Sequence, residues 1–336
     1  MYHAIKNVYV PVQFGDAIEL NPKRSFSKSM YATGIRALRS CFKNMRFSRF
    51  PYFVGTNNKR CDSLQCALSK NQGNCVAFAR YVQHYMLMRG YEAHLACSQT
   101  PSMYRKPGFL HVSHAVVVAP FRDGYMMMDA AFYMNKPIVV SRDGVIGDEY
   151  VIEHAYNRKD DAMRMDFRMK QKHTEEDIEY DYVKIPAHTP VIEGKLRTGD
   201  DEHYETVNYY LRDILNPDES LTTHTNYYDR RIMYTVTNSD GKIQLYLSLD
   251  LRDPDDVVLK CSDNLMSLSC PSLHSSDLFS PRRKDGTRSL RIKTIKTWSG
   301  FQLFCKHQKR SNKKCCLEKR ECIRNVIQIL RMFIRN

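Results

Sequence analysis

The sequence predicts an α+β protein in which a helix packs on a small antiparallel sheet, and three observations support this. A continuous amphipathic segment at residues 75–89 is followed by short apolar runs, and glycines and prolines separate those runs. A helical period followed by strands indicates segregated helices and strands rather than alternating βαβ units. The chain is 43% apolar and 26% charged, which is ordinary for a globular protein and excludes a disordered or fibrous one.

The helix predicted at residues 75–89 is the clearest single element. It contains no glycine or proline, and one face carries apolar side chains at helical spacing, namely Phe78, Ala79, Val82, Tyr85 and Met86. Gly90 follows as a left-handed C-cap. Asn74 is suited to be the N-cap, which places Cys75 in the first turn.

Weaker patterns predict the other elements of the first half. Apolar residues at spacings of three and four predict a helix at residues 31–47, and Tyr9, Val10, Val12 and Phe14 alternate as in a short strand. Further strands are predicted at residues 92–97, 111–119, 124–130 and 137–140. The apolar runs on either side of Asp123-Gly124 predict a hairpin.

Charge divides the chain into four predicted parts. Residues 1–150 hold the predicted core, with 19 basic and 9 acidic residues. Residues 151–220 carry 10 basic and 17 acidic residues and are predicted to be an acidic linker or insertion. Residues 221–280 are predicted to form a β-rich module with a second hairpin around Asn238-Ser239-Asp240-Gly241. Residues 281–336 carry 17 basic and 3 acidic residues, so the whole net charge of +14 equals the excess in this basic, flexible tail.

Length and cysteine content limit the class of protein. The 336 residues correspond to two domains, or to one with appendages. No apolar run approaches the length of a membrane span and no leader precedes Gly15, so a soluble, intracellular and by default cytoplasmic protein is expected. Eleven cysteines without a repeated spacing disfavour a secreted disulfide framework, and no paired thiols have zinc spacing, so neither a metal nor a cofactor is expected.

Three side chains of the predicted core combine into a candidate catalytic site. A thiol at a helix N-terminus, here Cys75, faces unpaired N–H groups and the positive end of the helix dipole, which stabilise a thiolate. Such a nucleophile needs a histidine base and a group that orients the histidine. His114 begins one predicted strand and Asp129 ends the next, so the hairpin between them can bring both side chains together.

Each of these residues also has a plainer interpretation. Cys75 alone is compatible with a small buried hydrophobic residue. His111 is an alternative base, although its position three residues earlier predicts the opposite face of the strand. Asp129 can instead bind the amides of a turn at the strand end.

The order of these residues resembles a known family. The stretches NQGNCVAFARYVQHYMLMRGYEAHLACSQ and HAVVVAPFRDGYMMMDAAF are similar to the core of the transglutaminase-like cysteine enzyme superfamily, which has a papain-like fold. The shared features are a Gly-x-Cys helix start, a His-Ala strand and an Asp in the next strand, within residues 70–140. The arylamine N-acetyltransferase branch is the near alternative, because Asp129-Ala130-Ala131-Phe132 and Pro137-Ile138 suit it.

The resemblance implies thiol-dependent acyl transfer or hydrolysis on peptide, isopeptide or amide bonds, as in a cysteine protease or acyltransferase. It implies that Cys75 attacks the carbonyl, His114 carries the proton and Asp129 fixes the imidazole. The backbone N–H of Cys75 and either Gln72 or Asn71 are the oxyanion candidates. Val116 stands where members commonly have tryptophan, and the only tryptophan is Trp298, so an indole donor does not carry over.

A second hypothesis treats the chain as a binding protein. A catalytically inactive transglutaminase-like protein would keep the fold, and its tail at residues 281–336 would bind nucleic acid, another anionic surface or an assembly. The sequence leaves the choice between enzyme and binding protein open. It specifies neither the protein or peptide substrate nor the oligomeric state.

Overall fold

The computed structural model describes residues 11–48, 68–102, 111–141, 144–146, 150–153, 162–180, 183–197, 204–217, 231–241, 243–250, 257–261, 288–289 and 324–330. The chain divides into two compact units. Unit 1 comprises Met1–Met45, Pro51–Asp229 and Ser239–Lys242, and unit 2 comprises Arg46–Phe50, Arg230–Asn238 and Ile243–Asn336.

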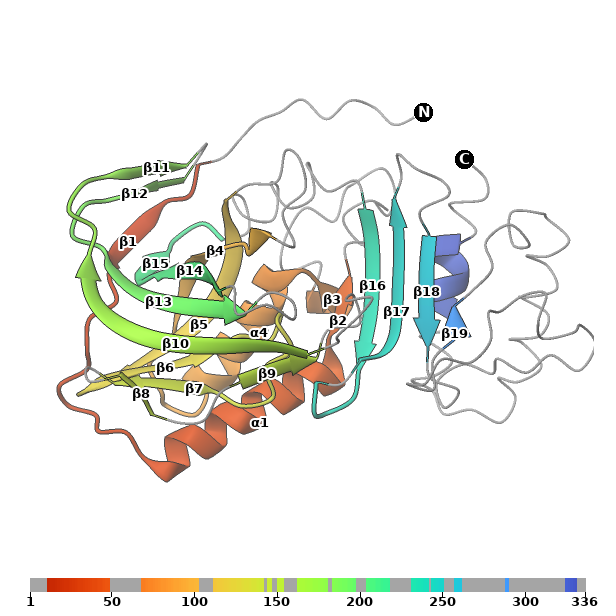
Figure 1. Cartoon of the computed structure of the whole chain (residues 1–336). Helices are drawn as coiled ribbons and strands as arrows, with labels where there is room; N and C mark the ends of the chain where they lie inside the picture. The colour runs from red at the N-terminus through yellow and green to blue at the C-terminus, as the bar shows by residue number, and fades with distance from the viewer. Residues whose placement is uncertain are drawn as a thin grey trace, which may run out of the picture. The chain divides into compact units, whose positions relative to one another are not determined.

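Among the described residues, unit 1 contains the helices α1 and α4 and most of the strands (Figure 1). Its elements are β1 (Phe14–Ala17), α1 (Lys28–Asn44), β3 (Gln72–Gly73), α4 (Cys75–Leu87), β4 (His94–Gln99), β5 (Val112–Phe121), β6 (Gly124–Met128), β7 (Ile138–Ser141), β8 (Gly144–Ile146), β9 (Tyr150–Glu153), β10 (Ala162–His173), β11 (Ile178–Tyr180), β12 (Val183–Ile185), β13 (Pro190–Arg197), β14 (Tyr204–Tyr210) and β15 (Arg212–Ile214).

Capping residues set where both helices begin. α4 begins at Cys75 behind Asn74 as predicted, and Gly90 has the expected left-handed conformation with φ of 74°. α1 begins three residues before the predicted start, because the side chain of Ser27 accepts the N–H of Met30 at 3.1 Å. It ends at Asn44 rather than at residue 47, since the backbone is extended from Met45 onward.

In the described part of unit 1, nine strands form one antiparallel sheet in the order β8-β7-β6-β5-β4-β14-β13-β10-β9. The predicted strands are β4 to β7, and the predicted hairpin joins β5 to β6 with Phe121 opposite Gly124. The sheet is larger than the small sheet predicted, because residues 150–210 supply β9, β10, β13 and β14. This part of the chain was predicted to be an acidic linker or insertion. β10 also contacts β7 and β8, so the sheet curls back on itself.

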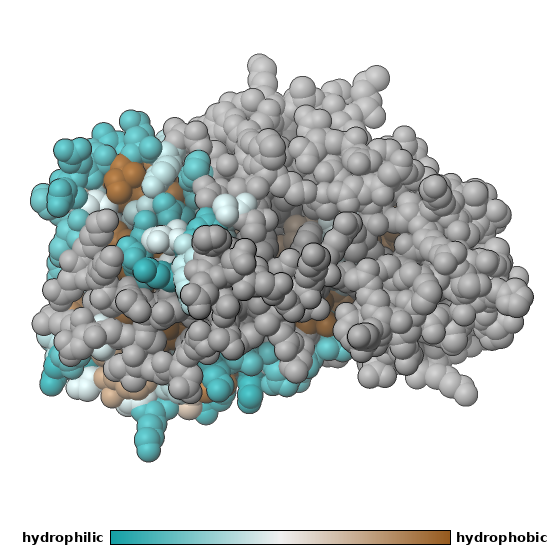
Figure 2. Space-filling view, in the orientation of Figure 1, coloured by the Kyte–Doolittle hydropathy of each residue, from teal (hydrophilic) through white to brown (hydrophobic). Residues whose placement is uncertain are grey.

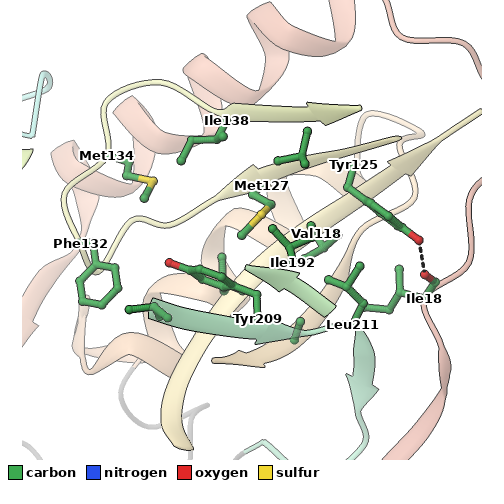
Figure 3. Packing of buried hydrophobic residues seen from close by; sticks show 14 residues of the cluster. Ile18, Val118, Tyr125, Met127, Phe132, Met134, Ile138, Ile192, Tyr209 and Leu211 are labelled. Atoms are coloured by element: carbon green, nitrogen blue, oxygen red, sulfur yellow. Dashed lines mark hydrogen bonds between the residues drawn. The ribbon is translucent and has the colours of Figure 1, made fainter. Parts of the chain in front are cut away.

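The two faces of this sheet are packed differently. One face carries a buried cluster, drawn in Figure 3, that consists of Ile18, Ala96, Val116, Val118, Tyr125, Met127, Phe132, Met134, Ile138, Val140, Ile192, Val207, Tyr209 and Leu211. The other face of β5 and β6 packs against the helices. Gly34 of α1 comes so close that a Cβ there would lie 3.1 Å from Cε of Met126 and 3.2 Å from Sδ of Met128. Burial of both faces explains why β5 and β6 are apolar at nearly every position.

Unit 2 is built on a second antiparallel sheet. Its strands β2 (Arg46–Ser48), β16 (Arg231–Thr237), β17 (Ile243–Asp250), β18 (Val257–Cys261) and β19 (Arg288–Ser289) pair in the order β19-β18-β17-β16-β2. The second predicted hairpin is confirmed as β16 and β17. In the tail, residues 324–330 are helical, and Nδ2 of Asn325 donates to the hydroxyl of Tyr234 at 3.1 Å. The rest of the predicted flexible tail lies outside the described residues, apart from β19.

The described surface is mainly hydrophilic. Figure 2 shows this for one face, where hydrophobic residues are scattered among hydrophilic ones. Four large hydrophobic side chains of the described residues are exposed: Leu87, Met88, Tyr204 and Leu215. Among the described residues, no helix has both the length and the apolar character needed to cross a membrane.

Candidate active site

The N-terminus of α4 carries the candidate nucleophile. Oδ1 of Asn74 accepts the N–H of Val76 at 3.1 Å and that of Ala77 at 3.5 Å, and these bonds fix the first turn. Cys75 is the first residue of the helix and is 6% exposed, and its Sγ lies 3.8 Å from the carbonyl oxygen of Ser113. The positive end of the helix dipole therefore lies at a thiol that is almost enclosed.

The β5–β6 hairpin brings His114 and Asp129 together. Val117 pairs with Met128, so continuing this register places Asp129 opposite Val116, one diagonal step from His114 on the same face. Nε2 of His114 lies 2.6 Å from Oδ2 of Asp129, and both side chains are buried. With Nε2 bound to the carboxylate, Nδ1 is the ring nitrogen left for the thiol.

Opposing effects determine the charge of His114. Burial lowers the pKa of the imidazole, whereas the charge and hydrogen bond of Asp129, and a hydrogen bond and the charge of Cys75, raise it. The attraction prevails and raises the pKa of His114 to about 10. The ring is therefore an imidazolium at neutral pH, held between a carboxylate and a sulfur atom.

The turn after β6 holds the second oxygen of the carboxylate. Oδ1 of Asp129 accepts the N–H of Phe132 at 3.1 Å, and the carbonyl oxygen of Asp129 accepts the N–H of Met134 at 3.2 Å. The ring of Phe132 stacks on the imidazole of His114 with centroids 4.3 Å apart and planes 25° apart. Both carboxylate oxygens of Asp129 therefore have defined partners, and one face of the imidazole is covered.

Cys41 and Cys97 are two further buried cysteines of unit 1. Burial raises the pKa of Cys41 well above its ordinary value. Burial, and to a lesser degree the nearby Cys75, also raises the pKa of Cys97 far above its ordinary range. Both thiols are therefore neutral at physiological pH, and neutral thiols are poor nucleophiles.

The remaining candidates occupy different positions around the helix start. Gln72 is buried three residues before Cys75, and its Oε1 has no hydrogen-bond partner among the described residues. Asn71 is exposed in the preceding turn, with a left-handed φ of 52°. His111, the alternative base, is exposed and stacks on Tyr180 with centroids 5.8 Å apart, whereas His114 is the histidine bound to Asp129.

Two contributors were not predicted from the sequence. Ser113 supplies the carbonyl oxygen next to the thiol, and no property of its side chain signals a backbone contact. Tyr209 of β14 lies near the site: burial, and then the charge of Asp129, raises its pKa well above the ordinary value. It comes from the segment interpreted as a linker, so no local pattern connects it with the hairpin.

The described residues contain no group of three or more His, Cys, Asp or Glu side chains that could hold a metal ion. Asp129 and His114 instead bind each other, and the carboxylate's second oxygen is used by a backbone N–H. The site therefore contains a sulfur nucleophile, an imidazole that can hold and return its proton, and a carboxylate that orients the imidazole.

Comparison with known proteins gives structural similarities only. No family model and no curated protein matches the sequence. The fold is similar to an arylamine N-acetyltransferase from Bacillus cereus, with 13% sequence identity, coverage of 71% of this chain and 90% of that chain, and a TM-score of 0.39. It is also similar to the arylamine N-acetyltransferase from M. smegmatis, with 11% identity, coverage of 68% of this chain and 76% of that chain, and a TM-score of 0.42. A third similar structure is the arylamine N-acetyltransferase from Nocardia farcinica, with 12% identity, coverage of 83% of this chain and 85% of that chain, and a TM-score of 0.42. Identities and TM-scores this low assign no activity, so the chemistry rests on the residues described above.

Proposed function

We propose that the protein is a thiol-dependent acyl-transfer enzyme with Cys75 as nucleophile, His114 as acid and base, and Asp129 as the group that orients the imidazole. The observation that carries the proposal is the 2.6 Å contact between buried His114 and Asp129, next to a thiol at the start of α4. A buried ion pair is costly unless both charges are satisfied, and here the imidazolium faces a carboxylate and a sulfur atom. This arrangement suits proton transfer to and from a sulfur nucleophile.

The acylation step follows from these positions. In the reactive pair the thiol proton of Cys75 already lies on Nδ1 of His114, so the ring is an imidazolium and the thiolate attacks the acyl carbonyl to form a C–S bond. The negative charge moves to the carbonyl oxygen. When the tetrahedral intermediate collapses, the bond to the leaving group breaks and the imidazolium returns the proton to that group, leaving Cys75 acylated.

Oxyanion stabilisation is assigned to the start of α4. The N–H of Cys75 belongs to the first turn, whose N–H groups have no acceptor within the helix. Of the two candidates, Gln72 is the better second donor to the oxyanion, because its side-chain amide is buried. Its Oε1 accepts no hydrogen bond from the described residues, so turning the amide to direct Nε2 at the oxyanion breaks no hydrogen bond to Oε1. Asn71 is exposed and is the weaker candidate.

Selective alkylation tests the nucleophile. Iodoacetamide should modify Cys75 at least about ten-fold faster than Cys41 or Cys97 near neutral pH, because the latter two thiols are neutral. Peptide mapping by mass spectrometry after timed quenching measures all three rates in one sample. Equal, slow labelling of the three thiols would contradict the proposal.

Acyl-enzyme formation tests the reaction itself. An activated ester such as p-nitrophenyl acetate should acetylate Cys75, and Cys75→Ala should abolish that modification. Adding a primary amine or only water then distinguishes transfer from hydrolysis, because the acetyl group goes either to the amine or to acetate. We place the natural donors among amides, including peptide and isopeptide bonds, and thioesters; a panel of such donors ranks them by kcat/KM.

The binding-protein hypothesis predicts a different result. Its basic tail, residues 281–336, falls largely outside the described residues, so its support is the local charge excess. A nucleic-acid complex that weakens with salt, survives Cys75→Ala and is lost on deletion of the tail would favour it. No acylation of Cys75 in the same preparation would complete that case.

A further inference from the structure

We propose that Phe132 is a positioning residue that holds His114 and Asp129 in one fixed arrangement. The proposal rests on the proposed function in taking His114 as the base that serves Cys75. Phe132 itself reaches no reacting atom in the proposed mechanism. It acts through the imidazole and the carboxylate.

The first argument is that one residue binds both members of the ion pair. The N–H of Phe132 donates to Oδ1 of Asp129 at 3.1 Å, while Oδ2 of the same carboxylate lies 2.6 Å from Nε2 of His114. The ring of Phe132 stacks on the imidazole of the same His114, with ring centroids 4.3 Å apart. Each of Asp129, His114 and Phe132 therefore contacts the other two, so moving any one of these residues disturbs both of its contacts.

The second argument is that the turn and the core hold Phe132 in place. The N–H of Tyr133 donates to the carbonyl oxygen of Ala130 at 3.1 Å, and that of Met134 to the carbonyl oxygen of Asp129 at 3.2 Å. Tyr133 has a left-handed φ of 58°, which few side chains adopt without surrounding support. The phenyl ring is 6% exposed and belongs to the same buried cluster as Met134 and Tyr209, labelled with it in Figure 3.

The third argument is electrostatic. The titratable groups that act on the imidazole are Asp129 and Cys75, and Tyr209 from β14 acts on Asp129. A phenyl ring over one face of the imidazolium keeps water off that face, so the attraction to the carboxylate is less screened, and the π face itself favours a cation. Opening that face relieves the burial that lowers the pKa of His114, but it also weakens the attraction that raises it. Because the attraction prevails in the wild type, we expect the pKa to fall towards its ordinary value.

The test compares Phe132→Leu with Phe121→Leu. Phe121 is also a buried aromatic residue of β5, but it lies seven residues beyond His114, about 23 Å along the strand. The imidazole pKa of His114 is followed by NMR, stability by urea unfolding, and the alkylation rate of Cys75 as a function of pH. Phe132→Met, which keeps an unbranched apolar side chain, serves if the leucine variant does not fold.

We expect Phe132→Leu to move the alkaline limit of Cys75 reactivity and the titration of His114 to lower pH by about one unit. The rate of acylation should fall about ten-fold, with KM little changed. Phe121→Leu should lower the free energy of unfolding without moving either titration. Phe132→Tyr keeps the ring, so its His114 titration and its Cys75 reactivity profile should match those of the wild type. The proposal is overturned if Phe132→Leu and Phe132→Met titrate like the wild type while losing stability, because Phe132 is then only a core residue.

The NMR titration separates this inference from the proposed function. If wild-type Cys75 is never acylated but Phe132→Leu still lowers the pKa of His114, the proposed function fails and the positioning role stands. If Cys75 is acylated and the titration of His114 does not respond to Phe132, the enzyme stands and the inference fails.

Discussion

His114 is the residue whose ionisation links the site to the stability of the protein. Its pKa is raised from 6.5 to about 10 in the folded protein, mainly because Asp129 attracts the imidazolium strongly enough to overcome burial. The folded state therefore keeps a proton that the unfolded state loses. The stabilisation is complete below about pH 6.5 and is lost as the pH rises through about 10.

The measurement is the free energy of unfolding in urea between about pH 6 and about pH 10. We expect it to fall more steeply with pH in the wild type than in His114→Gln, whose amide does not titrate. The two curves should converge at the alkaline end. Parallel curves would show that His114 does not carry this proton.

Asp129 gives a second prediction at the residue scale. Asp129→Asn keeps the shape but removes the charge, so burial is no longer opposed by a carboxylate and the pKa of His114 should fall. We expect Cys75 acylation to slow by about a hundred-fold or more, because the imidazole loses both its orientation and its charge partner. Stopped-flow release of p-nitrophenol measures the rate, and a variant that acylates at the wild-type rate would remove Asp129 from the mechanism.

Among the elements, α4 matters most because its capping residue precedes the nucleophile. Asn74→Ala removes the acceptor for the N–H groups of Val76 and Ala77 and should cost about 1 kcal/mol of stability. It should also slow the alkylation of Cys75, since the first turn that stabilises the thiolate frays. Urea unfolding and timed labelling measure the two effects.

Ser27 provides the matched control for this prediction. It caps α1 by accepting the N–H of Met30, so Ser27→Ala should cost about the same stability with no change at Cys75. Asn74→Asp, which keeps the cap oxygen, should retain the helix. Equal loss of Cys75 reactivity in Ser27→Ala and Asn74→Ala would mean that general destabilisation, and not the cap of α4, explains it.

Elements with local signals could be predicted from the sequence. α4, its N-cap at Asn74 and the left-handed Gly90 follow from residues adjacent in the chain, as does the two-residue turn between β5 and β6. The predicted start of α1 was three residues late because the prediction followed the apolar spacing from residue 31, and Ser27 lies before that pattern. A capping serine and a turn serine look alike until the helix behind it is known.

The size of the main sheet, by contrast, depends on long-range pairing. Residues 163–170 alternate methionine or phenylalanine with charged residues, a period of two that predicts the strand β10, but the acidic composition of the segment concealed it. The pairing of β14 with β4, which joins Tyr209 to Ser98, has no local signal. For the same reason the proximity of Tyr209 to Asp129 could not be predicted.

At the scale of the molecule, residues far along the chain support the turn that carries Asp129. Gly241 has a left-handed φ of 80°, and a Cβ there would lie 2.8 Å from the carbonyl oxygen of Tyr133 and 3.1 Å from the ring of Phe42. Gly241→Ala should therefore cost about 1–3 kcal/mol, from backbone strain and from displacement of the turn. It should also slow acylation, because Tyr133 adjoins Phe132.

Gly90→Ala separates the cost of backbone strain from the effect of displacing the turn. Gly90 also has a positive φ, of 74°, but a Cβ there would meet nothing within 4 Å. It should show the strain cost alone, with normal acylation of Cys75. If Gly241→Ala acylates as fast as Gly90→Ala, the contact with Tyr133 has no influence on the site.

The distant support for this turn has a consequence during synthesis on the ribosome. The thiol, imidazole and carboxylate are all translated before residue 130, whereas β14, which pairs with β4, and Gly241, which abuts Tyr133, emerge much later. A nascent chain that ends between these points carries every reactive group without the surroundings that hold them. We therefore expect ribosome-bound chains to acquire a fast-reacting Cys75 only after Gly241 has left the exit tunnel, so that reactivity begins at the end of folding and not with the appearance of the nucleophile.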